Sequence, residues 1–422
     1  MKNIAIALFI LTYILLLIFP KRRAYIALAS AAVFVISGIL PIGKVFSTID
    51  WNVILMIAGT MGIVSIFIES KMPALLADLI LEKTPNVKWA IISLSLFAGI
   101  ISAFVDNVAT VLMIAPVALD IAKKLKISPV TSIIAIAVSS NLQGAATLVG
   151  DTTSILLGGY ANLDFLDFFY FNGRIGIFWV VQAGALASTL VLAYILRKDK
   201  HPISSVEKTV VKDFFPTILL VGMVCLLIIA SFIPNTPRTI NGIICITLFA
   251  IGVIRESLKT KSFQFLSKTL LEIDYFTILL LAGLFIVVGG ITEVGVVDDL
   301  SKLFVRFSND NIFVIYTLIV WASVLFSAFI DNIPYVATML PVAGGIANIL
   351  NIEPYILYFG LLIGATLGGN LTPIGASANI TALGILQKDG YEVKAWDFMK
   401  IGIPFTLAAV TVGYVIIWLT WR

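Results

Sequence analysis

The sequence predicts an all-α, polytopic membrane protein that forms a single transmembrane domain over residues 1–422 and contains two inverted-topology repeats. Of its 422 residues, 60% are hydrophobic and 12% are charged, whereas a soluble domain has roughly 25% charged residues. The segment Ser102–Val117 is nearly repeated by Ser327–Val342, 225 positions later. Each copy carries an Asp within an apolar stretch, where a carboxylate is costly in hydrocarbon. Duplicated halves, each with a polar interruption, are typical of secondary transporters.

Uninterrupted apolar runs predict eight simple membrane crossings, because a bilayer core of ~30 Å requires about 20 residues of helix. A basic cluster, with no small-residue cleavage pattern, follows the first run, so we interpret that run as an uncleaved span. The eight crossings are expected near residues 3–20, 24–41, 51–69, 171–196, 214–233, 239–254, 274–292 and 400–420.

Four longer segments carry polar or glycine-rich interruptions. Segments 88–124 and 312–350 are each about twice the length of one span, and an Asp-Asn pair breaks each near its middle. We predict re-entrant hairpins that enter and leave by the same face. Segments 130–160 and 354–387 are predicted to be crossing helices that are interrupted midway. Such irregular backbone is tolerated at membrane depth only where protein or water satisfies it.

The distribution of basic residues supports this topology. With residues 21–23 inside, the inner segments 21–23, 70–88, 122–127, 197–213, 255–272 and 388–400 together hold 21 of the 28 Lys and Arg residues. This asymmetry is what the positive-inside rule requires. It gives the two halves opposite orientations, with repeat 1 over residues 24–196, a cytoplasmic linker over 197–213 and repeat 2 over 239–420.

The candidate binding site combines the hairpin tips with the breaks of the two crossing helices. Freed helix ends carry partial charges, and glycines let the backbone approach a ligand closely. Two such half-sites are expected to meet near the midplane. The predicted substrate- and ion-binding residues are Asp106, Asn107, Thr147, Gly150, Asp151, Thr152, Asp331, Asn332, Asn370, Thr372, Gly375, Ser377 and Asn379.

Asp106 and Asp331 have two alternative roles. Asp is a favourable N-cap, so each could simply cap the second arm of its hairpin. A Ser or Asn cap would place no charge in lipid, however, so two acids favour binding of Na⁺ or H⁺. Asp151 is a third acid, and the corresponding residue of the second half is Ala376. Asp151 either takes part in ion coupling or forms a local helix cap or salt bridge. Glu69 and Asp274 are expected to be interfacial or structural.

The charge of the predicted site restricts its ligand. Neither predicted core contains a Lys or Arg to offset the acids, so the site is expected to repel a dicarboxylate. A cation, a proton or a neutral polyhydroxy species such as an undissociated metalloid acid suits it better. We expect no catalytic residue, no cofactor other than the coupling ion H⁺ or Na⁺, and no nucleic-acid partner.

At these motifs the chain resembles the ion transporter superfamily, on the side of the arsenite pump ArsB, the sodium/proton antiporter NhaD and the P protein. The resemblance is closest at Ser102–Pro116, Ser327–Pro341 and Gly368–Asn379. The Gly-Ala-Ser-Ala-Asn stretch ending at Asn379 is similar to that branch. The dicarboxylate branch usually has Ser-Asn-Thr at the hairpin tips, where this chain has Asp106 and Asp331. The resemblance implies alternating access with an elevator-like movement. Because relatives are often dimers, it also implies a possible homodimer.

These observations predict a secondary active transporter of the ArsB/NhaD type in a prokaryotic plasma membrane. Proton-coupled export of a small inorganic solute, arsenite or antimonite, is favoured. The alternatives are a sodium/proton antiporter, a sodium-coupled dicarboxylate or anion symporter and a passive channel; an enzyme is not expected. No phosphate-binding loop motif occurs in the sequence, so any ATPase subunit that drives transport would be a separate protein.

Overall fold

The computed structural model describes the whole chain except residues 200, 203–208, 261–269 and 272. Its described elements are nearly all helices, which confirms the all-α class. The α-helices are α1 (Lys2–Ile18), α2 (Arg23–Ile36), α3 (Val45–Thr48), α4 (Trp51–Glu69), α5 (Met72–Leu81), α6 (Val87–Ser102), α7 (Asn107–Leu125), α8 (Val130–Gly144), α9 (Thr152–Ala161), α10 (Ile177–Ile195), α11 (Phe215–Ser231), α12 (Ile240–Thr260), α14 (Tyr275–Glu293), α15 (Val296–Ser308), α16 (Ile312–Ser327), α17 (Asn332–Leu350), α18 (Tyr355–Gly368), α19 (Ser377–Lys388) and α20 (Ala395–Trp421).

Short elements complete the described chain. They are the 3₁₀ turns η1 (Pro20–Arg22), η2 (Ile42–Lys44), η3 (Leu166–Phe168) and η4 (Gly369–Leu371), and the strands β1 (Tyr170–Phe171) and β2 (Arg174–Ile175). The two strands pair antiparallel across Asn172 and Gly173, both at positive φ. Two such residues are what a tight hairpin turn with the favoured twist requires.

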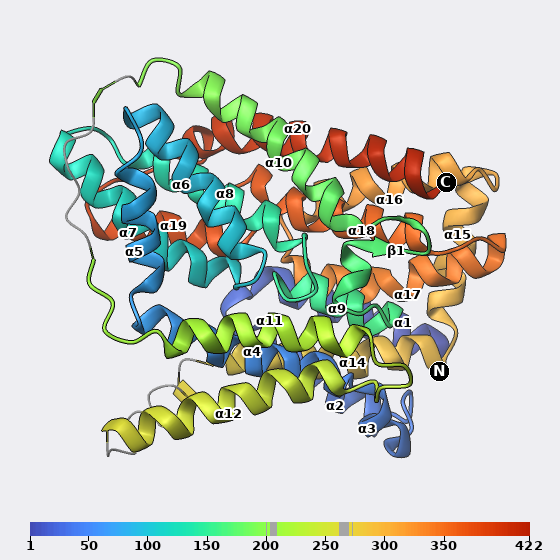
Figure 1. The fold of residues 1–422 in the computed structure, drawn as a ribbon. Coiled ribbons are helices and arrows are strands. Elements are labelled where there is room, and N and C mark those ends of the chain that lie inside the picture. Colours follow the sequence, from blue (N-terminus) through green and yellow to red (C-terminus); the bar gives the residue numbers. More distant parts are fainter. Residues whose placement is uncertain (200, 203–208, 261–269, 272) are drawn as a thin grey trace.

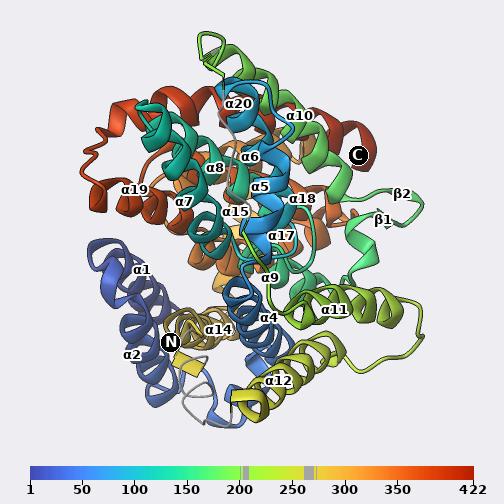
Figure 2. The ribbon, with the colours of Figure 1, turned by 60° about the vertical axis from the view of Figure 1, so that its left-hand side comes forward.

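The helices form two layers (Figures 1 and 2). Helices α2, α4, α11, α12 and α14 lie together as a lower layer beneath the bundle that contains α6–α8, α10, α16 and α18–α20. Two glycines set the closest packing within the lower layer. A Cβ atom on Gly59 of α4 would lie 2.4 Å from the carbonyl carbon of Cys245 on α12, and one on Gly283 of α14 would lie 2.7 Å from that of Ala27 on α2. The helices α4/α12 and α14/α2 therefore pack as equivalent pairs.

Most simple crossings occur as helices where the sequence predicts them. Among the described residues, six helices are long and apolar enough to cross a bilayer. Five of them, α4, α10, α12, α14 and α20, coincide with predicted simple crossings, whereas α17 is the second arm of a predicted hairpin. The predicted spans 3–20 and 24–41 correspond to α1 and the shorter α2, which meet at an angle of 114°. This bend places the exposed side chains of Lys21 and Arg22 at the corner between the two helices.

Both predicted hairpins and both predicted interrupted helices break at the expected residues. Helix α6 ends at Ser102 and α7 begins at Asn107, while α16 ends at Ser327 and α17 begins at Asn332. Helices α8 and α9 are separated by residues 145–151, and α18 and α19 by residues 369–376. The re-entrant course of the hairpins and the inverted orientation of the repeats stay predictions.

Two further helices were not expected from the sequence. Helix α5 follows α4, and α15 follows α14 at the corresponding place in the second half. Lys71 and Gly295, which precede these helices, both have positive φ, at 60° and 73°. The repeat therefore includes a backbone turn as well as residue types.

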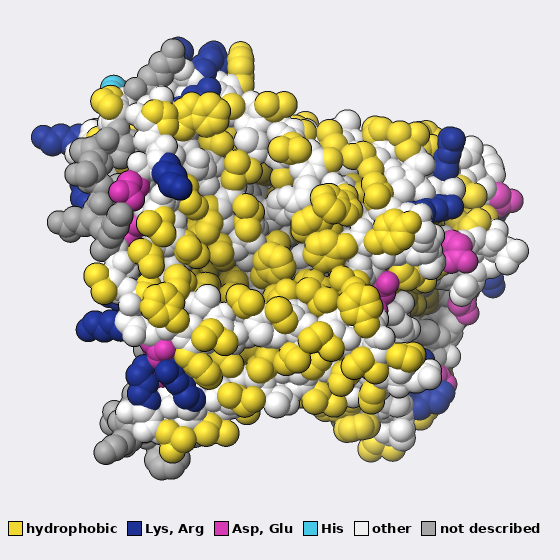
Figure 3. Space-filling view, in the orientation of Figure 1, with side chains coloured by type: hydrophobic (Ala, Val, Ile, Leu, Met, Phe, Trp, Pro, Cys, Tyr) yellow, Lys and Arg dark blue, Asp and Glu magenta, His cyan; other side chains and the backbone are white. Residues whose placement is uncertain are grey.

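The surface separates apolar from charged side chains. Figure 3 shows hydrophobic side chains over the middle of one face and most charged side chains toward its two ends. On α10, Leu186 and Leu190 are 68% and 73% exposed. Such exposure of large apolar residues suits contact with lipid.

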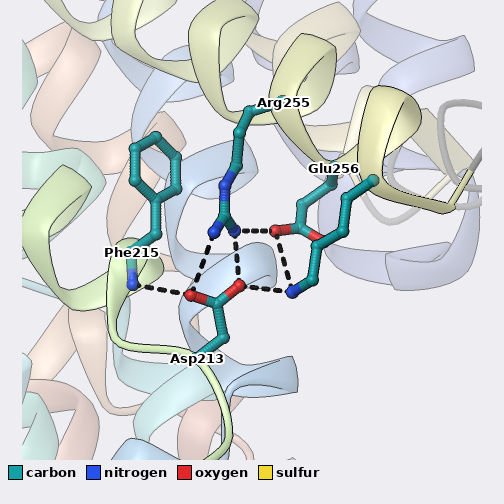
Figure 4. A network of polar contacts seen from close by, with 5 residues as sticks. Asp213, Phe215, Arg255 and Glu256 are labelled. Atoms are coloured by element: carbon teal, nitrogen blue, oxygen red, sulfur yellow. Dashed lines mark hydrogen bonds and ion pairs between the residues drawn. The ribbon is translucent and has the colours of Figure 1, made fainter.

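The end of the predicted cytoplasmic linker is fastened to α12 by charged side chains (Figure 4). Asp213 accepts hydrogen bonds from Arg255 and Lys259, with the Lys259 ammonium 2.5 Å from its carboxylate. Glu256 pairs with the same Arg255 guanidinium. The Arg255 guanidinium holds the pKa of the Asp213 carboxyl well below its usual range.

Candidate functional site

The two predicted hairpin tips have the same local geometry. Asp106 Oδ1 accepts hydrogen bonds from the backbone N–H groups of Val108 and Ala109 at 3.0 and 3.2 Å. Asp331 Oδ1 accepts one from the N–H of Ile333 at 3.0 Å. Each Asp therefore caps the second arm of its hairpin, because the first N–H groups of a helix have no partner within it. One oxygen of each carboxylate is left for another role.

The residues behind each tip are also joined in the same way. Ser102 donates to Asn107 Oδ1 at 2.7 Å, and Ser327 donates to Asn332 Oδ1. Thr147 donates to the carbonyl oxygen of residue 103, and Thr372 donates to that of residue 328. These bonds fasten each hairpin tip to the interrupted helix of its own half.

Glycines let the interrupted helices pass close to the tips. A Cβ atom on Gly150 would lie 2.7, 2.9 and 3.0 Å from the carbonyl oxygens of residues 144, 103 and 102. A Cβ atom on Gly375 would meet the carbonyl oxygens of residues 369, 328 and 327, each 225 positions further on, at 2.5, 2.9 and 2.9 Å. Only glycine fits such an approach, and the carbonyl dipoles converge beside each hairpin tip.

Buried amide groups connect the two halves. Asn107 donates to Asn141 Oδ1 at 3.1 Å, and Asn141 donates to Asn370 Oδ1 at 2.8 Å and to Asn379 Oδ1 at 3.2 Å. Asn379 itself donates to the carbonyl oxygen of Thr372 at 3.2 Å. Sequence reasoning missed Asn141, which follows two serines near the end of α8.

Asp151 caps α9 and also reaches the other half. Its carboxylate accepts hydrogen bonds from the Thr152 N–H at 2.7 Å and from the Thr153 hydroxyl at 2.9 Å. The Thr153 hydroxyl is in turn 2.9 Å from that of Thr366 on α18. The predicted local cap is therefore present, and the same carboxylate lies at the junction of the halves.

These groups meet at an acidic cavity of about 540 Å³. Asp106, Asp151 and Asp331 line it together with Glu69 and Asp274. None of its described lining residues is Lys or Arg. Glu69 ends α4 and Asp274 precedes α14, so the cavity extends toward the predicted inner face.

Eight of the thirteen predicted site residues line this cavity, and the other five lie outside its lining. The lining residues are Asp106, Asn107, Asp151, Thr152, Asp331, Asn332, Gly375 and Ser377. The residues outside it are Thr147, Gly150, Asn370, Thr372 and Asn379. Four of these contribute hydrogen bonds to the surrounding framework, and Gly150 contributes the close backbone approach described above.

An arginine beside the site corrects the expectation that no cation offsets the acids. Arg23 Nη1 lies 2.6 Å from Asp331 Oδ2, and both side chains are 19% exposed. The sequence placed Arg23 in a cytoplasmic loop, but the bend between α1 and α2 turns it toward α17. Asp331 is therefore paired, which leaves Asp106 and Asp151 as the uncompensated acids of the three.

A second cavity, of about 790 Å³, lies at the other ends of α4 and α14. Its lining mixes acids with the cations Lys44 and Arg238, and Lys44 pairs with Glu293 at 2.6 Å. The two cavities therefore lie at opposite ends of α4 and α14, and the acidic cavity is the one lined by the hairpin tips.

The interrupted helices, the apolar spans and the acidic cavity at the hairpin tips together define an integral, multi-pass membrane transporter. A model of the citrate transporter family matches residues 13–364, and the chain belongs to that family. This agrees with the resemblance to the ion transporter superfamily.

Relatives and solved structures support the same class. An uncharacterised transporter of Mycobacterium bovis is 31% identical over 99% of this chain and 98% of its own length. A 46 kDa membrane protein of Mycobacterium leprae is 32% identical over 99% of both chains. The human P protein is 25% identical over 92% of this chain and 56% of its own. These mycobacterial relatives agree with the predicted prokaryotic plasma membrane.

The fold is similar to those of two solved transporters. The YdaH transporter of Alcanivorax borkumensis superposes with a TM-score of 0.62 at 13% identity, over 90% of this chain and 86% of that one. MtrF of Neisseria gonorrhoeae superposes with a TM-score of 0.55 at 15% identity, over 96% and 83%. At these identities the likeness establishes the fold alone.

Proposed function

We propose that this protein is a secondary active transporter that is coupled to a cation, H⁺ or Na⁺, at Asp106 and Asp151. The observation that carries the proposal is the acidic cavity, which five carboxylates line. A carboxylate in a low-dielectric site attracts a cation far more strongly than it does in water. Transport without chemical conversion of the solute is part of this proposal.

The same electrostatics restrict the solute. A free citrate or dicarboxylate anion would meet Asp106, Asp151, Asp274 and Glu69 on entering from the cavity mouth. Like charges repel strongly where little water screens them. A cation or a neutral species is therefore the better candidate, and sodium/proton exchange is the mode that the acidic cavity supports most directly.

Export of arsenite or antimonite is the second candidate. Thr152, Ser377 and Asn332 bring neutral hydroxyl and amide groups to the cavity wall. Such groups can hydrogen-bond an undissociated metalloid acid while a carboxylate holds the coupling proton. The neutral donors support this mode, and proton coupling is common to both candidates.

Movement between the layers is the proposed route of access. The acidic cavity is lined by α4 of the lower layer and by the hairpin tips of α7 and α17. The glycine contacts pack α4 closely against α12 and α14 closely against α2, whereas the hairpins are fastened to the interrupted helices. We infer that the hairpins and interrupted helices move as one body against the lower layer, in an elevator-like step.

The test uses inside-out membrane vesicles with a preset proton gradient. Addition of Na⁺ or Li⁺ is expected to collapse the gradient, and Asp106→Asn or Asp151→Asn is expected to abolish the response while the protein stays folded in the membrane. Asp298→Asn, on the exposed face of α15, is the matched control and should behave as the wild type.

The outcomes separate the candidates. A response to arsenite alone would establish metalloid export in place of sodium/proton exchange. Solute movement only down its own gradient would indicate a channel. Silence to Na⁺, Li⁺ and arsenite, or full activity of both Asp variants, would contradict the proposal.

A further inference from the structure

The Arg23–Asp331 ion pair breaks the similarity of the two half-sites. Ala27 of α2 packs against Gly283 of α14, and Cys245 of α12 packs against Gly59, the corresponding glycine of α4. Ala27 and Cys245 are therefore equivalent positions. Arg23 lies four residues before Ala27, and Asn241 lies four residues before Cys245. The position that corresponds to Arg23 in the second half is therefore neutral, and it lines the second cavity of about 790 Å³.

The ion pair joins two different parts of the fold. Arg23 begins α2 of the lower layer, whereas Asp331 precedes α17. One turn along α17, the Tyr13 hydroxyl donates to the carbonyl oxygen of Pro334 at 2.7 Å and bonds to Thr338. The corner between α1 and α2 is thus attached to the start of α17 by the charge pair and by neutral hydrogen bonds.

The guanidinium is a permanent cation at Asp331. Arg does not lose its proton in proteins, so a change of pH between 5 and 9 does not remove the charge of Arg23. Both partners are largely buried, at 19% exposure, where a charge pair is only weakly screened. A cation from solution can bind Asp331 only by displacing this group.

The first half-site has no such occupant in the part of the chain that the structure describes. Asp106 accepts hydrogen bonds from the N–H groups of Val108 and Ala109. Asp151 accepts them from Thr152 and Thr153. All of these donors are neutral, so a cation that enters the cavity finds uncompensated charge at Asp106 and Asp151.

We propose that Arg23 is a tethered cation that occupies Asp331 and confines the coupling cation to the half-site of Asp106 and Asp151. This inference rests on the proposed cation coupling. Arg23 acts through Asp331 and so determines how many cations the site accepts. Without it, the repeated sequence would provide two cation sites.

The experiment measures thermal unfolding of the purified full chain in detergent at pH 8, with NaCl exchanged for choline chloride at constant ionic strength. Stabilisation by a bound ion grows with the logarithm of its concentration, once for each ion bound. Arg23→Gln should unmask Asp331 and roughly double the slope of stabilisation against the logarithm of Na⁺ concentration. A slope equal to that of the wild type would overturn the inference.

A second set of variants tests the inference if Arg23→Gln does not fold. Asp331→Asn leaves Arg23 unpaired next to a residue that lines the acidic cavity, and it should weaken the response to Na⁺ about tenfold, because a like charge opposes cation binding. The double variant R23Q/D331N should restore the wild-type response. A merely structural role for the pair would leave the double variant as unresponsive as D331N. Arg238→Gln, which removes an exposed cation at the second cavity, is the matched control.

The same data distinguish this inference from the proposed function. If the wild type responds to Na⁺, D106N does not and R23Q keeps the wild-type slope, the proposed function stands and the role of Arg23 is refuted. If only R23Q responds, Arg23 does mask Asp331, and sodium coupling in the wild type is refuted. No response in any variant contradicts both.

Discussion

Replacing Asn141 by Leu should destabilise the junction between the two halves. The Asn141 amide accepts one hydrogen bond from Asn107 and donates one each to Asn370 and Asn379. Leu has the same number and branching of side-chain heavy atoms but no polar atom, so all three bonds are lost and three buried polar atoms lose this partner. Hydrogen bonds between helices in membranes contribute about 0.6–1.7 kcal/mol each, so the loss should be roughly 2–5 kcal/mol.

The assay is unfolding of the purified protein in detergent mixed with increasing SDS, followed by circular dichroism. Ser132→Ala on the same helix is the control, because Ser132 donates only to the Pro129 carbonyl of its own first turn, at 2.8 Å. The control should lose less than about 1 kcal/mol. If N141L unfolds within about 0.5 kcal/mol of the control, the amide network does not stabilise the junction and the reasoning is refuted.

Two further predictions concern a close backbone contact and the linker. Gly375→Ala should destabilise the protein by about 1–3 kcal/mol by overpacking, whereas Gly384→Ala, whose Cβ would meet open space, should be neutral or slightly stabilising in the same unfolding assay. Asp213→Asn should speed tryptic cleavage of the linker, because it removes the contacts to Arg255 and Lys259. Since the folded pKa of Asp213 is depressed, its stabilisation should be complete above about pH 4 and fade only as the pH falls further. Equal cleavage of D213N and wild type at pH 7 would contradict this.

The breaks in the helices were predictable because their signals are local. Asp-Asn pairs and glycine clusters interrupt long apolar runs, and the second copy of each signal confirmed the register. The capping geometry of Asp106 and Asp331 followed from the same residues. Eight predicted residues line the cavity because hairpin tips and helix breaks leave polar backbone that must gather where protein or water satisfies it.

Other features had no local signal. Glu69 and Asp274 were expected to be interfacial or structural, and their place in the wall of the acidic cavity could not be read from their neighbours in the sequence. Asn141 was one polar residue among several in its helix. Its role depends on amides more than 200 positions away, at Asn370 and Asn379, which no periodicity in α8 can indicate.

The sequence by itself determined the membrane class, the repeat, the breaks and the acids at the hairpin tips, because hydropathy and internal similarity are properties of neighbouring residues. The tertiary structure alone decided the charge balance of the site. Arg23 and Asp331 are separated by 308 positions, and they meet only because α1 and α2 bend by 114° while α2 packs against α14. Coulomb attraction depends on distance in space, so a residue that reads as a loop cation became the counter-ion of a buried acid.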